Sequence, residues 1–258
     1  MTWIKKYRPG EIILRVCYNT LHVKMQNDTS GGTMVKIFLD LEMNPIAKGF
    51  DVDRALCRNE VIQIGAVALD DNGSFIGEYE QMVKPQFSIA VAPKVYRLTG
   101  ITSDMIQKGV SFEEAINDLS AWCERISDHH QYEIYAWSDN DLIQLQQEML
   151  IKDLTYFFDM QFMNVWTDFQ FIFCELLGIS AALSLDKAVQ ALDMNFTGSQ
   201  HSALSDSMNT GKIYLMVQNQ EAFEKVMKPI KEMMEPSKPI GTQLGSVFNL
   251  DMFDLDND

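Results

Sequence analysis

The sequence predicts one α/β domain whose mixed, five-stranded sheet is flanked by helices. Three strand-like segments come first, and strands then alternate with helical segments toward the C-terminal end, which is the pattern of a sheet covered by helices. The chain has 258 residues with 47% hydrophobic content, enough for one sizeable core. Division into two domains would leave each of them small, so we expect a single core.

The predicted sheet opens with an antiparallel meander. Short apolar runs rich in strand-forming residues, at 35–41 and 61–69, predict the first two strands. Residues 70–73 (Asp-Asp-Asn-Gly) are typical of a hairpin turn, and the alternating segment 75–83 predicts the third strand.

Helices and strands alternate in the rest of the predicted domain. Ser111 and Glu114 have the spacing of a capping box, and the apolar residues after them follow helical spacing. Gly178 is a stop signal for a later helix. The remaining predicted elements are strands at 133–137 and 162–166 and helices at 142–151, 169–177, 184–192 and 203–217.

The two ends differ in composition from the predicted domain. Residues 1–33 end in a run of helix- and strand-breaking residues, so we expect an N-terminal extension outside the core, with Met34 as the natural start. The domain itself is predicted to span residues 34–220. Residues 221–258 are expected to hold a terminal helix and then an acidic tail without regular structure.

The charge of the chain limits the classes of function. With 21 Lys and Arg against 36 Asp and Glu, the net charge of −15 excludes a broad basic surface that would coat nucleic acid. A carboxylate cluster filled by cations can still bind phosphate, so a metallonuclease is compatible with this acidity.

The cysteines and the hydropathy indicate the cellular setting. Cys17, Cys57, Cys123 and Cys174 are scattered and lack the spacing of zinc ligands, which favours reduced thiols in the cytoplasm. No apolar run approaches the length of a membrane span, so we expect no contact with a membrane.

The first candidate for chemistry is the pair Asp40 and Glu42, at the expected end of the first strand. Side chains two residues apart on a strand share one face, so both carboxylates point the same way. Such a pair can hold a cation between its carboxylates. It can equally be two solvated acids at a strand end.

The second candidate follows the strand predicted at 133–137. Asp139, Asn140 and Asp141 lie where this strand ends and a helix begins, a place where α/β sheets carry their sites. All three residues are also ordinary helix caps, and spacing alone does not choose between the two aspartates.

The third candidate is the pair His201 and Asp206. Five residues are about one and a half helical turns, so helical geometry alone does not bring both side chains to one centre. If His201 lies just before the helix, its ring can swing over a site that Asp206 reaches from the first turns. Alternatively, His201 is simply the cap of that helix.

These three elements, in this order and at this separation, resemble the Exo I, Exo II and Exo III motifs of the DEDDh 3′–5′ exonuclease family. The resemblance covers about residues 35–217 and includes supporting stretches at 60–66, 98–102 and 209–210. It implies a ribonuclease H-like, three-layer α/β/α fold. Trp137-Ser138-x-x-Asp141 is similar to the Trp-Gly-x-x-Asp pattern of the enhanced-RNAi and KapD-like branch, which implies that Asp141, not Asp139, is the functional acid.

The resemblance implies a catalytic set and a reaction. Asp40, Glu42, Asp141 and Asp206 are expected to hold two ions, and a set of carboxylates selects hard cations such as Mg²⁺ or Mn²⁺. His201 is expected to be the general base. The expected reaction is hydrolysis of single-stranded RNA or DNA from a free 3′ end, releasing nucleoside 5′-monophosphates by a two-metal mechanism.

Three further residues are candidates for substrate binding. Trp137 matches the tryptophan of the second motif and could stack on the terminal base, although a core aromatic residue is an equal alternative. Met43 and Leu98 could contact the same nucleotide, with a place in the core as the alternative.

The chain departs from the family pattern at two places. Ser202 and Ser205 replace the family's Arg and Asp beside the third motif, and neither position belongs to the five catalytic groups. Met43-Asn44-Pro45 follows Glu42 in place of small hydroxyl residues, which alters the expected contacts to the sugar.

Two rival functions stay open from the sequence. One is a DNA proofreading or repair exonuclease that works with a polymerase partner. The other is a non-catalytic interaction protein, with an exonuclease fold, that binds a protein through its acidic C-terminal tail. The complete set of five catalytic residue types favours an enzyme over the second rival.

Overall fold

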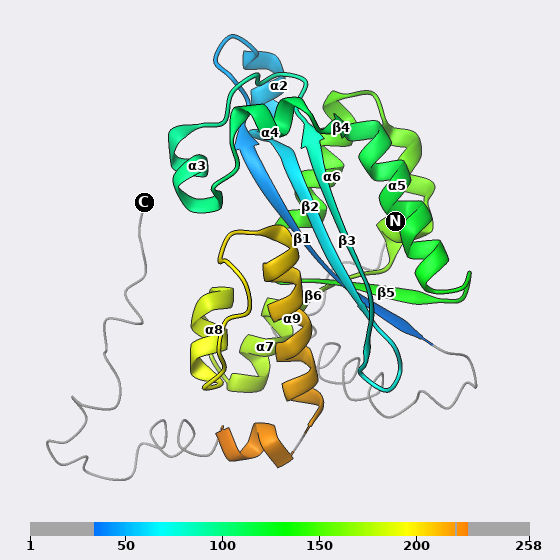
Figure 1. Cartoon of the computed structure of the whole chain (residues 1–258), viewed down its shortest axis with the longest axis vertical. Coiled ribbons are helices and arrows are strands. Elements are labelled where there is room, and N and C mark those ends of the chain that lie inside the picture. The colour runs from blue at the N-terminus through cyan, green and yellow to red at the C-terminus, as the bar shows by residue number, and fades with distance from the viewer. Residues whose placement is uncertain (1–33, 220, 227–258) are drawn as a thin grey trace, which may run out of the picture.

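The computed structural model describes residues 34–219 and 221–226 (Figure 1). The predicted extension before Met34 and the predicted tail beyond residue 226 lie outside the described residues. Residues 221–226 are helical, as expected for the start of the C-terminal segment. No helix in the described ranges is long and apolar enough to cross a membrane.

The described chain alternates strands and helices in the predicted manner. In chain order the elements are β1 (Val35–Pro45), α2 (Asp51–Leu56), β2 (Asn59–Leu69), β3 (Phe75–Lys84), α3 (Pro93–Thr99), α4 (Ser103–Gln107), β4 (Val110–Ser111), α5 (Phe112–Ile126), β5 (Tyr132–Ala136), α6 (Asn140–Ile151), the 3₁₀ helices η1 (Thr155–Asp159) and η2 (Gln161–Asn164), β6 (Trp166–Asp168), α7 (Phe169–Leu177), α8 (Leu185–Ala191) and α9 (Ala203–Gln218).

The predicted meander is confirmed, and so are the predicted hairpin turn, capping box and helix stop. β1, β2 and β3 pair antiparallel, and Asp70 closes the hairpin by accepting hydrogen bonds from the backbone N–H groups of Asn72 and Ser74. The capping box of α5 is complete, because Ser111 and Glu114 each bond to the other's backbone N–H. Gly178 ends α7 in the left-handed conformation.

The described sheet has six strands, in the order β4-β3-β2-β1-β5-β6, so the predicted number of five is wrong. The two-residue β4 was not predicted because it is too short to show an alternating pattern. β5 runs parallel to β1, and β6 runs parallel to β5, which makes the sheet mixed as expected.

The strand predicted at 162–166 is also wrong. Phe162 and Met163 are both buried and belong to η2, and the strand begins only at Trp166. The indole N–H of Trp166 donates to the carbonyl of Phe162, four residues earlier in the chain. Two adjacent buried side chains gave a strand-like apolar pattern although the backbone is helical.

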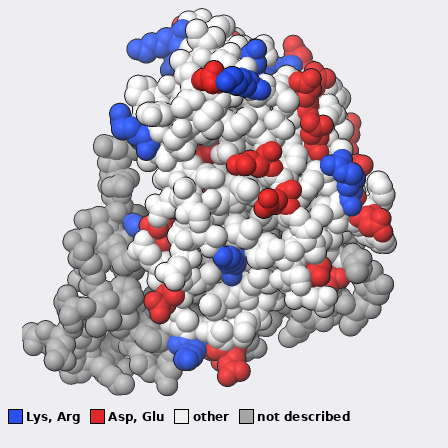
Figure 2. Space-filling model, viewed as in Figure 1, with Lys and Arg blue, Asp and Glu red and all other residues white. Residues whose placement is uncertain are grey.

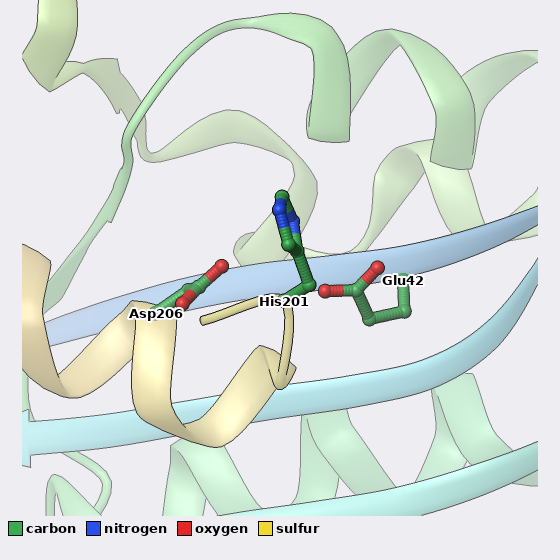
Figure 3. Close-up of side chains that lie close together, drawn as sticks. All are labelled: Glu42, His201 and Asp206. Atoms are coloured by element: carbon green, nitrogen blue, oxygen red, sulfur yellow. The ribbon is translucent and has the colours of Figure 1, made fainter. Parts of the chain in front are cut away.

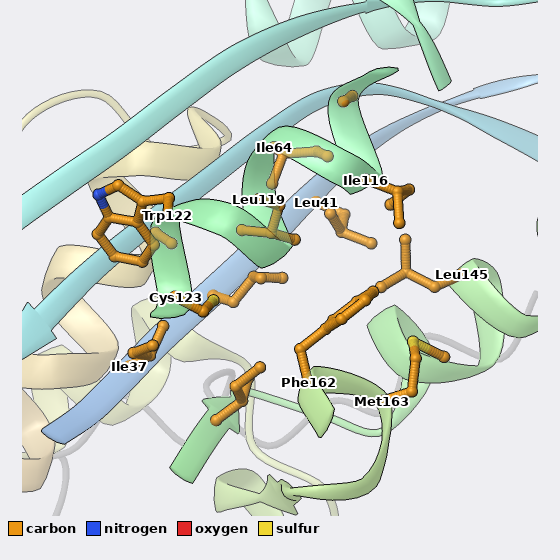
Figure 4. Packing of buried hydrophobic residues seen from close by; sticks show 14 of the residues in the cluster. Ile37, Leu41, Ile64, Ile116, Leu119, Trp122, Cys123, Leu145, Phe162 and Met163 are labelled. Atoms are coloured by element: carbon orange, nitrogen blue, oxygen red, sulfur yellow. The ribbon is translucent and has the colours of Figure 1, made fainter. Parts of the chain in front are cut away.

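Two apolar cores cover the two faces of the sheet. On β1, Ile37 and Leu39 face a core shared with α5 and α6, whereas Phe38 faces a core shared with α7, α8 and α9. Figure 4 shows the first core, with Leu119 and Leu145 of the helices packed near the strands. Since helices lie on both faces, the predicted three-layer α/β/α architecture is confirmed.

Candidate active site

Asp40 and Glu42 lie on one face of β1, as predicted, but inside the strand and not at its end. Pairing with β2 continues to Pro45, past a register shift after Glu42. The parallel pairing with β5 stops earlier, at Leu39 opposite Ala136. From Asp40 onward the β5 side of β1 therefore lacks a strand partner, and another element can approach there.

Asp141 is the acid that takes this place. It lies in the first turn of α6, which follows β5 directly, and its carboxylate accepts a hydrogen bond from the backbone N–H of Leu41. Asp141 is 6% exposed, whereas Asp139 is exposed and makes no side-chain cap bond to the helix. Burial thus separates two aspartates that spacing could not separate.

His201 and Asp206 reach the same site from the face of the sheet opposite to the one that α6 covers. Asp40 and Glu42 share the face of Phe38, against which α9 packs. Ligand atoms of Glu42, His201 and Asp206 lie within 4.8 Å of one another, and Figure 3 shows the imidazole between the two carboxylates.

The backbone at His201 explains how two residues five apart can meet. Ser202 is the N-cap of α9, so His201 lies just before the helix and is not its cap. Its φ of 60° is in the left-handed region, which turns the chain sharply before the helix begins. The backbone N–H of His201 also donates to the carboxylate of Asp206.

Three residues hold α9 and the preceding loop against the sheet, and sequence reasoning assigned them no role. Gln63 accepts a hydrogen bond from the N–H of Ala203, in the first turn of α9. Gly65, opposite Asp40, leaves no room for a side chain, because a Cβ there would overlap the α9 backbone. Asn209, fully buried, bonds through both side-chain atoms to the backbone of Thr197. Gln63, Gly65 and Asn209 fall in the family-like stretches, which was the available signal.

The four carboxyl groups lie so close together, and so buried, that their ionised forms are disfavoured in the absence of cations. Burial raises the pKa of Glu42 and of Asp206 to about 7, and that of Asp141 to about 8, with the neighbouring acids adding to the rise for Glu42 and Asp141. The pKa of Asp40 is raised well above its ordinary value, first by burial and then by the charges of the other three acids. Among the described residues no Lys or Arg forms an ion pair with any of them.

This cluster has the chemistry of a hard-cation site. One carboxylate oxygen, Oδ1 of Asp206, is buried without a hydrogen-bond partner in the described structure. A buried polar atom without a partner costs about 1–3 kcal/mol, which a bound cation would recover. A set of carboxylate oxygen donors suits Mg²⁺ or Mn²⁺ better than soft metals.

The three candidate substrate contacts have different surroundings. Trp137 is 7% exposed, packs against Phe173 and donates its indole N–H to the carbonyl of Leu183. Met43 is half-buried and, like Trp137, lines a cavity beside Asp40. Leu98 is 47% exposed at the end of α3, so its alternative place in the core is wrong.

Comparisons with known proteins agree with this geometry. A family model described as Exonuclease (RNase_T) matches residues 37–214. ERI1 exoribonuclease 2 of Xenopus laevis is 26% identical over 173 residues, which cover 60% of this chain and 25% of that protein. The chain therefore aligns with about a quarter of that relative's length. Probable 3′-5′ exonuclease KapD of Bacillus subtilis (strain 168) is 21% identical over 171 residues, which cover 66% of this chain and 78% of that protein.

A solved structure shares the fold. The nuclease domain of 3′hExo, described as a DEDDh family member bound to rAMP, superposes with a TM-score of 0.61 at 18% identity, covering 74% of this chain and 94% of that one. The family model spans most of the described residues and contains all five site residues. The chain belongs to the exonuclease family.

Proposed function

We propose that this protein is a metal-dependent exonuclease that shortens single-stranded nucleic acid from its 3′ end and releases nucleoside 5′-monophosphates. The observation that carries the proposal is the meeting of four carboxylates and one imidazole, from β1, α6 and the start of α9, around a buried oxygen without a partner. Phosphodiester hydrolysis needs mainly positioning and charge stabilisation, which such a cluster supplies.

Asp40, Glu42, Asp141 and Asp206 are the proposed ligands of two divalent ions, Mg²⁺ or Mn²⁺. When bound, two such ions stabilise the charge of a scissile phosphate and activate water. The carboxylates sit on rigid elements, two on the central strand and two in the first turns of helices. Their mutual positions are therefore set by the sheet and by the packing of α6 and α9 against it.

His201 is the proposed general base. Its side chain is exposed, so water can reach the imidazole, and its ring nitrogen lies close to the carboxylates of Glu42 and Asp206. In this place the ring can take a proton from the attacking water.

RNA is the first substrate to test. The Xenopus relative is named an exoribonuclease, and the 3′hExo structure contains rAMP, a ribonucleoside 5′-monophosphate. A polymerase-associated role predicts the opposite preference, for DNA. A cytoplasmic location and a protein partner for the acidic tail also stay predictions of ours.

The test uses the full chain with Mg²⁺ or Mn²⁺ and matched single-stranded RNA and DNA oligonucleotides. A 5′-labelled strand should shorten stepwise, and a 3′-labelled strand should release labelled mononucleotide from the first moment. The Asp206→Asn variant should do neither. Inactivity of the wild-type protein with both metals would refute the proposal and favour a binding role, and shortening from the 5′ end would refute the proposed direction of cleavage.

A further inference from the structure

A cavity of about 590 Å³ opens beside the carboxylates of Asp40 and Asp141, which form part of its lining. Its volume lies within the range of protein sites for small ligands, about 300–1,000 Å³. The connection from β1 to β2, which includes α2, supplies much of the rest: Ala55, Leu56, Arg58 and Asn59. Acids and an arginine therefore line the same space.

Arg58 is a cation in this space without an acidic partner. Its side chain is exposed, and no Asp or Glu of the described chain forms an ion pair with it. Its backbone is nevertheless fixed, because the carbonyl of Arg58 accepts a hydrogen bond of 3.0 Å from Ile46. Arg54, in the preceding turn, differs because it pairs with Asp51 at 3.5 Å.

A second hollow, also about 590 Å³, continues from the first. It shares Ala55, Arg58 and Asn59 with the cavity and adds Pro45 and the ion pair of Arg54 with Asp51 to its lining. The two hollows thus form a track that leads away from the acids, with Arg58 at their common border. Figure 2 shows several Lys and Arg side chains, with Asp and Glu side chains among them, at the end of the molecule where Figure 1 places α2, α3 and α4.

The chemistry of this track fits one kind of ligand. A guanidinium forms paired, charge-assisted hydrogen bonds with phosphate. In a chain of net charge −15, a single strand must be held by such local cations, since the general field repels it. Beyond the scissile phosphate, the strand carries one further phosphate for each additional nucleotide, and Arg58 borders the acidic site.

We propose that Arg58 binds the phosphate next to the scissile one on its 5′ side, so that the strand leaves the active site along the β1–β2 connection. This inference rests on the proposed function, and it adds the path of the substrate. The contact with Arg58 needs a strand of at least three nucleotides, because an unphosphorylated dinucleotide contains only the scissile phosphate.

The test compares a dinucleotide with a trinucleotide, both without a terminal phosphate, for the full-length wild-type protein and for Arg58→Gln. The ratio of kcat/KM for the trinucleotide to that for the dinucleotide should fall about tenfold in the variant. On longer strands the salt dependence of log(kcat/KM) should become shallower by about 0.7, the value for one lost phosphate contact. Arg58→Lys should restore part of the ratio.

Arg125→Gln is the matched control, since Arg125 is also exposed but lies in the last turn of α5 and lines neither hollow. An unchanged ratio in Arg58→Gln, or an equal fall in the control, overturns the inference while the exonuclease activity of the wild type stands. If the wild type shortens no single strand, longer oligonucleotides included, the proposed function fails. In that case, fluorescence anisotropy of a labelled single strand tests the phosphate contact of Arg58. The Arg58→Gln variant must then bind the strand about tenfold more weakly than the Arg125→Gln control.

Discussion

Two groups of buried acids share the helix α6, and they differ in whether the protein itself supplies a cation for them. The active-site group has four carboxylates and no basic side chain paired with them in the described structure. The second group, the buried ion network, consists of Glu60, Glu148 and Lys152. Here the Lys152 Nζ lies 3.2 Å from Glu60 and 2.7 Å from Glu148, and all three side chains are at most 4% exposed.

Hydrogen bonds within the protein also satisfy the acids of the buried ion network. Glu148 accepts from the backbone N–H of Val61 and from Gln144, and Glu60 accepts from the N–H groups of Gln86 and Phe87. Burial raises the pKa of Glu148, but the charge of Lys152 and the hydrogen bonds from Val61 and Gln144 oppose this rise. The buried ion network is complete within the protein, whereas the active-site group requires cations from outside. α6 carries Asp141 at its start and the network at its end, so the network also fixes the position of Asp141.

The largest expected effect comes from breaking the active-site group at Asp141. Asp141→Asn should lower exonuclease turnover about a thousandfold or more, because it removes a metal ligand. In metal-free buffer the variant should be at least as stable as the wild type, since one repelling charge is gone. Asp139→Asn, two residues away and exposed, is the control and should stay within about twofold of the wild type. An equal loss of turnover in both variants would contradict the choice of Asp141 over Asp139 as the metal ligand.

Replacing His201 should separate turnover from metal binding. His201→Ala should lower kcat about a hundredfold, the range of a lost general base, while calorimetric titration of Mn²⁺ shows nearly unchanged affinity. The reason is that the four carboxylates are the proposed ligands and the imidazole is not. Lost Mn²⁺ affinity in this variant would place His201 among the metal ligands and contradict the division of roles.

Breaking the buried ion network should reduce stability. Lys152→Met should lower the free energy of unfolding by about 3–5 kcal/mol, because Glu60 and Glu148 lose their cation while they are buried. Lys108→Met is a matched control, since Lys108 and Asp104 have the same i,i+4 spacing at 2.6 Å but are about three-quarters exposed. That control should lose less than about 1 kcal/mol in urea denaturation. Similar losses in both variants would show that burial does not govern the network.

The pH dependence of stability should distinguish the metal-free from the metal-bound protein. Glu42, Asp141 and Asp206 have pKa values of about 7 to 8 in the folded chain against ordinary values near 4, so the folded state binds more protons between these limits. Stability without metal should therefore fall as the pH rises from about 4 to about 8, by a few kcal/mol in all. Excess Mn²⁺ should remove this fall, because the ions replace the protons. A flat profile in EDTA would contradict the raised pKa values.

Much of the fold could be predicted because its signals are local. The alternating strands of the meander, the capping box of α5 and the glycine that ends α7 each act within a few residues. α2 was not predicted because it has six residues and none of them is buried, so it lacks an apolar face. The helical turn at 162–163 was mistaken for a strand because its burial depends on tertiary packing.

The residues of the candidate site could be named from the sequence, but their geometry could not. The order and spacing of Asp40, Glu42, Asp141, His201 and Asp206 indicated the set through the family resemblance. The choice of Asp141 could be checked only by burial, which the sequence does not contain. The left-handed backbone of His201 lies in a loop whose Thr197 is bonded to Asn209, twelve residues further along, and spacing along a helix cannot reveal either feature.

The β1–β2 connection, which carries α2 and Arg58, suggests how such an enzyme can diversify. Asp40 and Glu42 stand on the part of β1 that is still paired with β2, whereas α2 and Arg58 belong to the connection beyond the end of that strand. Exchange of this connection between relatives would alter which polymers are accepted, and how long they must be, while the reacting groups keep their places. Protein engineers could therefore retarget the chain by transplanting a single surface segment.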